Sequence, residues 1–212
     1  LRQSMILGTA GLTALMCSFT TKATREELLL GEKVENLIVS GASGGVGSMS
    51  VMILNKLGCN VTAVTGKDSN AEYLKSIGAK NIINTKELNK DARPLDKGLW
   101  DGAVDTVGGK VLENILAQTK DTGIVAACGN AADIKLNTTV MPFIIRGVKL
   151  WGINSVTVST KRRQFLWNEA GKLIDFEILE KSIKEINLDE VKDVYPKMLK
   201  GETSGRYIID VN

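Results

Sequence analysis

The chain has 212 residues, which is enough for one large domain or one and a half ordinary ones. Hydrophobic residues make up 43% of it and charged residues 24%, so a buried core under an ordinary charged surface is expected. The net charge is only +3, the lysines are scattered and aromatic residues amount to 5%, so neither a nucleic acid nor a membrane is expected as a partner.

Along the chain, a buried helix is expected at 2–18 and a charged connection at 25–33. Short apolar runs and helical patterns then alternate. The expected strands lie near 37–40, 61–65, 80–84, 101–107, 123–128 and 148–154. The expected helices between them lie near 45–57, 69–77, 109–119 and 141–146. Such alternation requires right-handed crossovers, and it predicts an α/β fold with a doubly wound parallel sheet.

The sequence becomes more charged from about residue 160. The expected elements of this tail are a helix from 161, a strand at 177–187, a helix at 189–200 and a last strand at 205–211. These elements do not complete a second domain. We therefore divide the chain into a sheet domain, 1–160, and a C-terminal helix with a return segment, 161–212.

The glycine-rich turn Gly41–Gly47 joins the first expected strand to the helix that follows it. Such a turn brings backbone N–H groups up to a diphosphate, and the helix N-terminus supplies positive potential. The expected donors are the N–H groups of Gly45 and Val46, with Gly44 in the turn and Ser43 lining it. A glycine signature alone is weak evidence, but in this strand–turn–helix setting it predicts a Rossmann-type dinucleotide site.

The second strand ends at Thr65, where an NAD-binding domain usually has Asp or Glu for the ribose hydroxyls. Gly66 and Lys67 follow it. A hydroxyl and an ammonium group would hold the 2′-phosphate that a carboxylate repels, so NADP(H) is predicted rather than NAD(H). Two readings remain open beside this one: Asp68 is close enough to swing toward the ribose, and Lys67 is alternatively a solvated loop lysine.

Two later strands end in the small-residue turns Asp105–Gly108 and Ala126–Gly129. Ligands of open α/β sheets lie across the carboxyl ends of the strands, so these turns should wall the adenosine and nicotinamide ends of the site. We interpret Asp105 as a structural carboxylate that bonds local backbone rather than as a catalytic base.

The three cysteines are widely spaced and form no Cys-x-x-Cys pair, and histidine is absent. Scattered cysteines in odd number predict free thiols in a reducing compartment, and hence a cytoplasmic protein. Without histidine the commonest zinc ligand and general base is missing, so no metal site is expected.

Six segments occur in an order that resembles a known family. They are Gly8–Ala14, Gly41–Gly47, Tyr73–Ala79, Asp105–Gly108, Thr139–Phe143 and Gly205–Arg206. The chain resembles the zinc-independent medium-chain dehydrogenase/reductases, and most of all their acryloyl-CoA reductase branch, whose members are often labelled quinone oxidoreductases. The resemblance implies a two-domain subunit in which a barrel-like substrate domain comes first. That barrel is missing here, and 161–212 would return toward it.

Carried over by position, the resemblance places Thr13 near the nicotinamide end, Ser43, Gly45 and Val46 at the diphosphate, and Thr65 with Lys67 at the 2′-phosphate. The residues implied for the nicotinamide pocket are Val107, Cys128, Gly129, Asn154 and Ser155. Packing at the ends of the sheet strands is the alternative interpretation of these last five. The resemblance also implies a homodimer through the nucleotide-binding domain, with the strand at 148–154 as its edge.

The activity implied by the resemblance is NADPH-dependent reduction of the carbon–carbon double bond of an α,β-unsaturated acyl-CoA. Reduction of quinones or small enones and a non-catalytic nucleotide-binding module remain as alternatives. Arg162 and Arg163 would help to dock a CoA tail, unless they only form a solvated helix face. No catalytic residue is assigned, and the chain alone is expected to bind nucleotide with negligible turnover.

Overall fold

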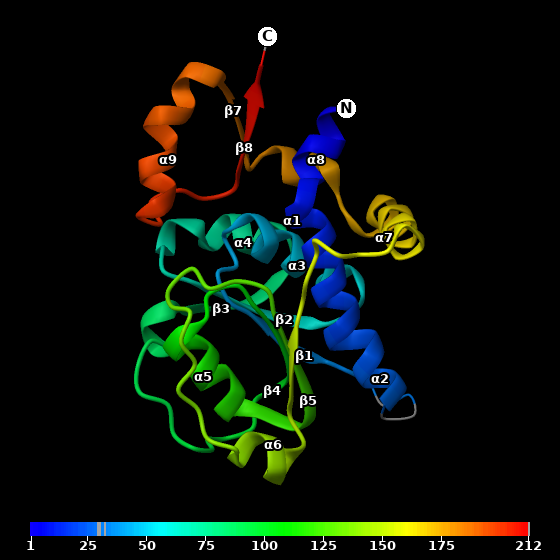
Figure 1. The fold of residues 1–212 in the computed structure, drawn as a ribbon, viewed down its shortest axis with the longest axis vertical. Coiled ribbons are helices and arrows are strands. Elements are labelled where there is room, and N and C mark those ends of the chain that lie inside the picture. Colours follow the sequence, from blue (N-terminus) through cyan, green and yellow to red (C-terminus); the bar gives the residue numbers. More distant parts are fainter. Residues whose placement is uncertain (29–30, 32, 212) are drawn as a thin grey trace.

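The structure, a computed structural model, describes residues 1–28, 31 and 33–211 (Figure 1). Its centre is a six-stranded sheet in the order β3-β2-β1-β4-β5-β6, in which all pairings are parallel. The strands are β1 (Asn36–Val39), β2 (Asn60–Thr65), β3 (Ala79–Asn84), β4 (Trp100–Asp105), β5 (Thr119–Ala127) and β6 (Lys149–Gly152). The predicted doubly wound parallel sheet is confirmed.

Helices cover both faces of this sheet (Figure 1). The helices of the first part are α1 (Arg2–Phe19), the π-helical turn Thr20–Thr24, α2 (Arg25–Leu28), α3 (Gly45–Lys56), α4 (Ala71–Ser76), α5 (Gly109–Gln118) and α6 (Met141–Arg146). Leu37 and Val39 of β1 belong to the apolar cluster under α1 and α3, whereas Ile38 between them belongs to the cluster under α5. This alternation follows from the pleat of a strand that is buried on both faces.

Most boundaries predicted from the sequence lie within a few residues of the observed ones. The largest difference in the sheet is β5, which begins at Thr119 rather than near 123. A register shift between Trp100 and Gly102 and a positive φ of 59° at Thr122 let the strand continue through a polar stretch. The connection expected at 25–33 instead begins with α2, and its residues 29, 30 and 32 lie outside the described residues.

The tail contains α7 (Thr160–Leu173), α8 (Phe176–Glu180), β7 (Ile183–Asn187), α9 (Val191–Leu199) and β8 (Arg206–Asp210). The strand predicted at 177–187 is wrong over its first residues, which form α8. The cause is Asp175, whose carboxylate caps this helix by accepting the N–H groups of Glu177 and Ile178, each at 3.1 Å. β7 and β8 pair with each other in parallel as a separate sheet.

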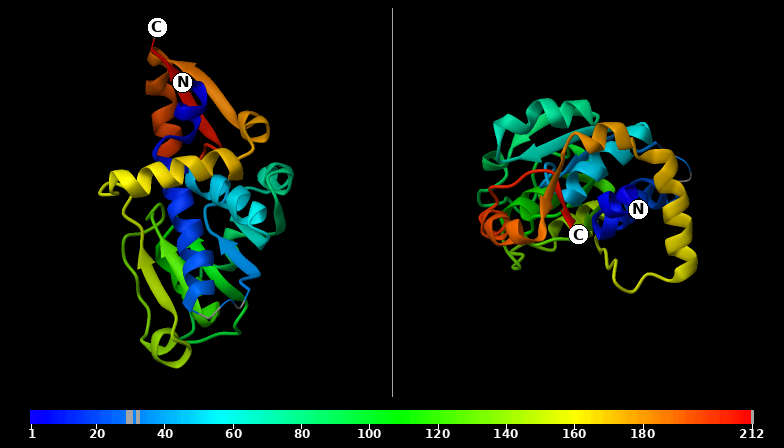
Figure 2. Two further views of the ribbon diagram at one scale, coloured as in Figure 1. Left: turned by 90° about the vertical axis from the view of Figure 1, so that its right-hand side faces the viewer. Right: turned by 90° about the horizontal axis from the view of Figure 1, so that it is seen from above.

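The first half of the tail is anchored on the sheet domain. Leu166 and Ala170 of α7 and Leu179 of α8 are buried in the cluster under α1 and α3. Figure 2 shows α7 lying across α1, while β7, α9 and β8 extend beyond the body of the molecule. The division of the chain at residue 160 stays a prediction, since packing of this kind joins the two parts without showing where a domain ends.

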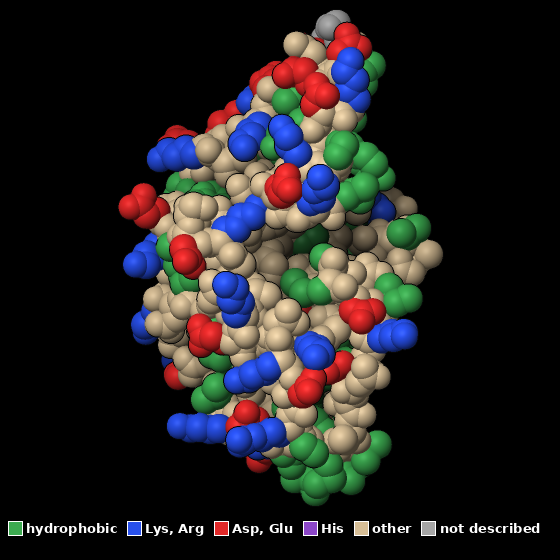
Figure 3. All heavy atoms as spheres, turned by 90° about the vertical axis from the view of Figure 1, so that its left-hand side faces the viewer, with side chains coloured by type: hydrophobic (Ala, Val, Ile, Leu, Met, Phe, Trp, Pro, Cys, Tyr) green, Lys and Arg blue, Asp and Glu red, His purple; other side chains and the backbone are tan. Residues whose placement is uncertain are grey.

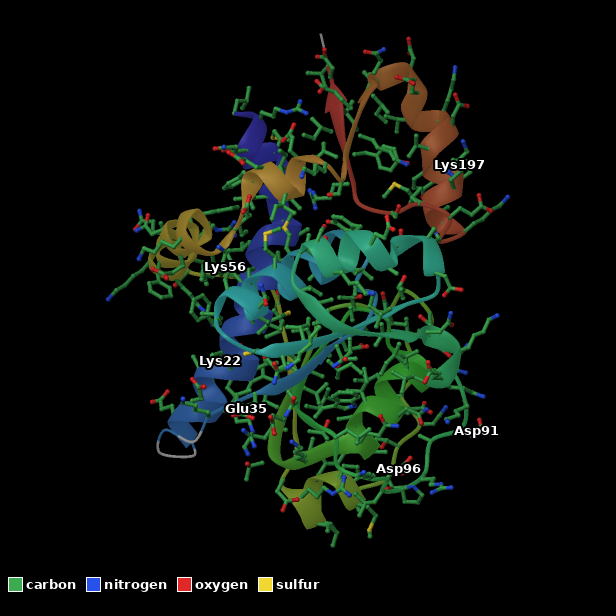
Figure 4. All side chains as sticks on the ribbon, turned by 180° about the vertical axis from the view of Figure 1, so that it is seen from behind. Lys22, Glu35, Lys56, Asp91, Asp96 and Lys197 are labelled. Atoms are coloured by element: carbon green, nitrogen blue, oxygen red, sulfur yellow. The ribbon has the colours of Figure 1, made fainter. Side chains whose placement is uncertain are left out.

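The long N-terminal helical segment is also the one helix, within the described ranges, with the length and apolarity to cross a membrane. Of the residues in its apolar window, 67% are buried inside the protein. The charged residues Lys56, Asp91 and Lys197, by contrast, are exposed at the periphery of the molecule (Figure 4).

Candidate nucleotide-binding site

The glycine turn after β1 brings the backbone of a strand and a helix into direct contact. A Cβ atom at Gly47 would lie 2.3 Å from the carbonyl oxygen of Gly41, and a Cβ atom at Gly41 would lie 2.2 Å from Thr106 Oγ1. Gly41 also has a φ of +57°, a conformation that L side chains rarely adopt. The turn is closed by the N–H of Gly44, which donates to Gly41 O at 2.9 Å. Only glycine allows this approach at both positions.

The N-terminus of α3 lies at this turn, and its first residues are Gly45 and Val46. Their N–H groups have no carbonyl of the same helix to donate to, because they belong to the first helical turn. Gly44 is the N-cap and supplies no side-chain acceptor, and the first turn contains no acidic residue. The N-terminus of this twelve-residue helix therefore presents two N–H donors together with the positive end of the helix dipole, and both favour a bound anion.

The end of β2 lies beside the turn. Ser43 Oγ and Thr65 Oγ1 are 3.3 Å apart, so the structure brings together two residues expected to touch different phosphates. Thr65 is buried, and its hydroxyl accepts the N–H of Lys67 at 3.3 Å. Lys67 Nζ donates to the carbonyl of Thr203 at 3.0 Å, so this lysine contacts the tail rather than solvent alone. Asp68 accepts from Asn84 Nδ2 at 3.2 Å and is thereby tied to the end of β3.

Arg206 is a site residue to which the sequence analysis gave no role. Its Nη1 lies 2.9 Å from the position that a Cβ atom would take at Gly45, and its Nη2 lies 3.2 Å from the same position at Gly8. The loop before it is tied to the turn, because Gly205 N donates to Ser43 O at 3.0 Å. Gly205–Arg206 belonged to the family resemblance, yet nothing in the linear sequence indicates that residue 206 returns to residue 45.

The guanidinium group of Arg206 is partly buried, and among the described residues it has no counter-ion. Burial lowers the pKa of Arg206, and its Nε is buried without a hydrogen-bond partner in the described part of the chain. No carboxylate of the described residues forms an ion pair with it. A partly buried cation without a partner costs free energy, so an anion bound at this position would be stabilised.

At the other end of the carboxyl edge of the sheet lies an open cavity of about 500 Å³. Its lining residues are Ala127, Cys128, Gly129, Asn130, Gly152, Ile153 and Asn154. The structure thus brings together Cys128, Gly129 and Asn154 of the predicted nicotinamide pocket. A Cβ atom at Gly129 would lie 2.4 Å from the carbonyl oxygen of Thr106, so this wall also depends on a glycine contact.

The other predicted pocket residues lie outside that lining. Thr13 is buried in α1, and its hydroxyl donates to Thr9 O at 2.8 Å. Val107 lies next to the glycine turn, where its Cγ2 is 3.2 Å from the position of a Cβ atom at Gly41. Ser155 follows Asn154 and is half-buried. The roles assigned to these residues stay predictions.

Asp105 is fully buried at the end of β4, and its carboxylate bonds local backbone, as predicted. Its carboxylate accepts from Ser40 Oγ at 2.6 Å and from the N–H of Gly108 at 2.9 Å. Burial raises the pKa of Asp105, and these hydrogen bonds oppose the shift. The carboxylate therefore holds the turns after β1 and β4 against each other.

These features define a Rossmann-type dinucleotide-binding domain, with its glycine turn at the point where the strand order reverses between β1 and β4. Residues 45–171 match the family described as zinc-binding dehydrogenase. The chain belongs to this family and to the medium-chain dehydrogenase/reductases.

Two curated relatives are acrylyl-CoA reductases by name. The chain is 42% identical over 211 residues to a probable acrylyl-CoA reductase AcuI of Escherichia coli, and the match covers 100% of this chain and 64% of the relative. It is 35% identical over 211 residues to YhfP of Bacillus subtilis, which is named "Putative quinone oxidoreductase", and this match covers 99% of the chain and 63% of that relative. A second AcuI, from Ruegeria pomeroyi, is 39% identical over 212 residues, covering 100% and 63%.

Among solved structures, the chain superposes with a TM-score of 0.91 on the yhdH oxidoreductase of Salmonella enterica in complex with NADP, at 41% identity. That match covers 99% of this chain and 63% of the other. The E. coli YhdH structure with bound NADPH gives a TM-score of 0.89 at 40% identity, covering 100% and 64%. The chain thus spans less than two thirds of the length of these relatives.

The family description mentions zinc, but the donor set of this chain does not fit such a site. The sequence has no histidine, and the described residues contain no group of three His, Cys, Asp or Glu side chains placed to hold a metal ion. Tetrahedral zinc sites in proteins need three or four such ligands. We therefore derive no step through zinc.

We predict that replacing Gly47 by alanine destabilises the protein by about 1–3 kcal/mol, since the new methyl group would overlap the backbone of Gly41. Urea unfolding measures this change. Gly171→Ala is the matched control: it lies in α7 with no atom within 4 Å of a new Cβ, so it should leave stability unchanged or raise it slightly. Equal effects of the two substitutions would contradict the contact.

Proposed function

We propose that the chain is the nucleotide-binding part of an NADPH-dependent oxidoreductase. The observation that carries this proposal is the guanidinium of Arg206, which has no ion pair among the described residues and lies beside the N-terminal N–H donors of α3. A diphosphate bound there would accept the N–H groups of Gly45 and Val46, and its charge would neutralise Arg206. Relatives that share the fold at 40–41% identity carry NADP or NADPH in their crystal structures, which supports this assignment.

The 2′-phosphate is assigned to Thr65, Gly66 and Lys67. The hydroxyl of Thr65 and the ammonium group of Lys67 would act as donors, while Gly66 leaves the loop free of a side chain. Lys67 contributes a point charge without the fork geometry of arginine, so it favours a phosphate over a hydroxyl without bidentate hydrogen bonds. A structure of YhfP with bound NAD, at 34% identity, shows that the fold of these relatives also accepts the other nucleotide.

The nicotinamide end is assigned to the cavity at Cys128, Gly129 and Asn154, with Thr13, Val107 and Ser155 as further contacts. When bound, the cofactor supplies the hydride for the β-carbon of the substrate. The part of this chain is to hold and orient it at the carboxyl edge of the sheet. We assign no proton donor to a residue of this chain.

Calorimetry with NADPH and NADH tests the cofactor assignment. Arg206→Met should weaken both nucleotides about tenfold or more, because both carry the diphosphate and a charged hydrogen bond is worth about 1.5–3 kcal/mol. Lys67→Ala should weaken NADPH about tenfold and leave NADH unchanged, since only NADPH has the 2′-phosphate.

Arg93→Met is the control for loss of a positive charge, because the side chain of Arg93 is 78% exposed and lies in a surface ion pair. It should change neither affinity. If the wild-type chain bound neither nucleotide, or if Arg206→Met bound both as tightly as wild type, the proposed site would be wrong.

For the complete subunit we propose reduction of the carbon–carbon double bond of an α,β-unsaturated acyl-CoA such as acryloyl-CoA. Support comes from two relatives at 39–42% identity that are named acrylyl-CoA reductases. A relative named as a quinone oxidoreductase, at 35% identity, keeps reduction of quinones as a second candidate. Both reactions use the same hydride donor and differ in the acceptor.

A side-by-side assay of the complete subunit with acryloyl-CoA and a benzoquinone separates these candidates. We expect the larger kcat/KM with acryloyl-CoA, measured by NADPH oxidation. The present chain alone should bind NADPH with negligible turnover. A larger kcat/KM for the quinone would favour the second candidate, and binding without turnover of either substrate in the complete subunit would favour a non-catalytic module.

We also infer a cytoplasmic homodimer that forms through β6. β6 is an edge strand of the sheet, and its backbone groups are free to pair with a second copy across a twofold axis. Apolar side chains gather at the α6 end of the molecule (Figure 3). Ile144 and Ile145 of α6 are 68% and 61% exposed, and Trp151 of β6 is 47% exposed. The cytoplasmic setting is inferred from the three free cysteines.

Trp151→Lys should convert the dimer to a monomer, because it places a charge within the apolar interface. Light scattering coupled to size-exclusion chromatography gives the molar mass. Tyr195→Lys on α9 is the control, since Tyr195 is 59% exposed but lies away from β6, and it should leave the mass unchanged. A wild-type chain that is monomeric at high concentration would contradict the dimer.

A further inference from the structure

Two of the three cysteines meet at the carboxyl edge of the sheet. Cys17 lies on α1 and is fully buried, whereas Cys128 directly follows β5 and lines the open cavity described above. Helix α1 packs against β5, and Cys128 packs against the buried apolar cluster that contains Cys17, where the two thiols interact. The Cys128 thiol also donates to the carbonyl of Asp105 at 3.5 Å. The sequence separates these residues by more than half of the chain, and only the fold brings them together.

We propose that Cys17 and Cys128 form a reversible disulfide when the protein meets a peroxide. Both residues are held in place. Cys17 belongs to the apolar cluster under α1 and α3, and the backbone N–H of Cys128 donates to Asp105 O at 2.9 Å. This proposal does not depend on which nucleotide the domain binds.

The two thiols differ in a way that sets the order of the steps. The hydrogen bond from Cys17 lowers the pKa of Cys128, although burial and the charge of Asp105 oppose this shift. The same hydrogen bond, together with burial, raises the pKa of Cys17 well above its ordinary value. Because thiolates attack peroxides, Cys128 is the thiol that reacts first, and its place in the cavity wall gives the oxidant access.

The reaction balances with one peroxide. The sulfur of Cys128 attacks one peroxide oxygen and the O–O bond breaks, which leaves a sulfenic acid on Cys128 and releases one water from hydrogen peroxide. The thiol of Cys17 then attacks the sulfenic sulfur, the S–S bond forms, and a second water leaves with the proton of Cys17. Two thiols are oxidised and one peroxide is reduced. A dithiol reverses the change by exchange.

Cys59 provides an internal control for this chemistry. It is buried under α3, its thiol donates to Val34 O at 3.7 Å, and burial raises its pKa to about 11. No other cysteine is hydrogen-bonded to it within the part of the chain that the structure describes. It should therefore remain reduced under conditions that oxidise the Cys17–Cys128 pair.

Peptide mapping of the reduced chain after treatment with hydrogen peroxide tests the proposal. Remaining thiols are alkylated, and the chain is digested with trypsin without reductant. Trypsin releases the three cysteines on three separate peptides, 3–22, 57–67 and 121–135, so each link is identified by mass. We expect peptides 3–22 and 121–135 to appear joined, two hydrogens lighter than their sum, and Cys59 to be alkylated. Dithiothreitol should separate the joined peptides.

Two variants sharpen the test. In Cys17→Ala, Cys128 should stop at the sulfenic acid and be trapped by dimedone. In Cys59→Ala, the link should form as in wild type. If Cys17→Ala does not fold, the wild-type map still decides. A link that includes Cys59, irreversible oxidation of Cys128 with Cys17 still free, or three free thiols at peroxide concentrations that oxidise the urea-unfolded chain would overturn the proposal.

Discussion

The backbone contact between Gly41 and Gly47 is the constraint on which the site depends. It brings the N-terminus of α3 against the end of β1, at the point where the strand order of the sheet reverses. Because the contact is between main-chain atoms, it leaves no room for a side chain. It also fixes the position of the N–H groups of Gly45 and Val46 in the first turn of α3. Asp105 stabilises the same region from the neighbouring strand by bonding Ser40 and the N–H of Gly108.

The charge balance of the site is set by the tail of the chain. Arg206 and the N-terminus of α3 are both electropositive, and they lie against each other with no carboxylate of the described residues between them. Such an arrangement is unfavourable without a ligand and becomes favourable with an anion of two charges. Lys67, held at Thr203 O, adds a third positive group along the same edge. The surface is hollowed between the C-terminal elements and the sheet domain (Figure 3), where such a ligand would lie.

The tail therefore has two parts with different roles. α7 and α8 contribute Leu166 and Leu179 to the core and are part of the packed body. Among the described strands, β7 and β8 pair only with each other, and the loop that leads into β8 delivers Gly205 and Arg206 to the glycine turn. The chain covers 63–64% of the length of its relatives, and a subunit with a further domain is what the proposed reduction of an acyl-CoA would require.

The sequence by itself predicted the doubly wound parallel sheet and the glycine turn. The alternation of apolar strands and helical patterns is a local property of the sequence, and so is the need for glycine in a tight turn. The sequence also predicted Thr65 and Lys67 as contacts of the 2′-phosphate, because they lie at the end of a strand and just after it. It misplaced the start of the strand at 177–187, where the Asp175 cap favours a helix. Only the tertiary structure decided that Arg206 reaches Gly45 and that Cys17 meets Cys128. Such contacts between distant residues depend on how the elements pack, which no local spacing encodes.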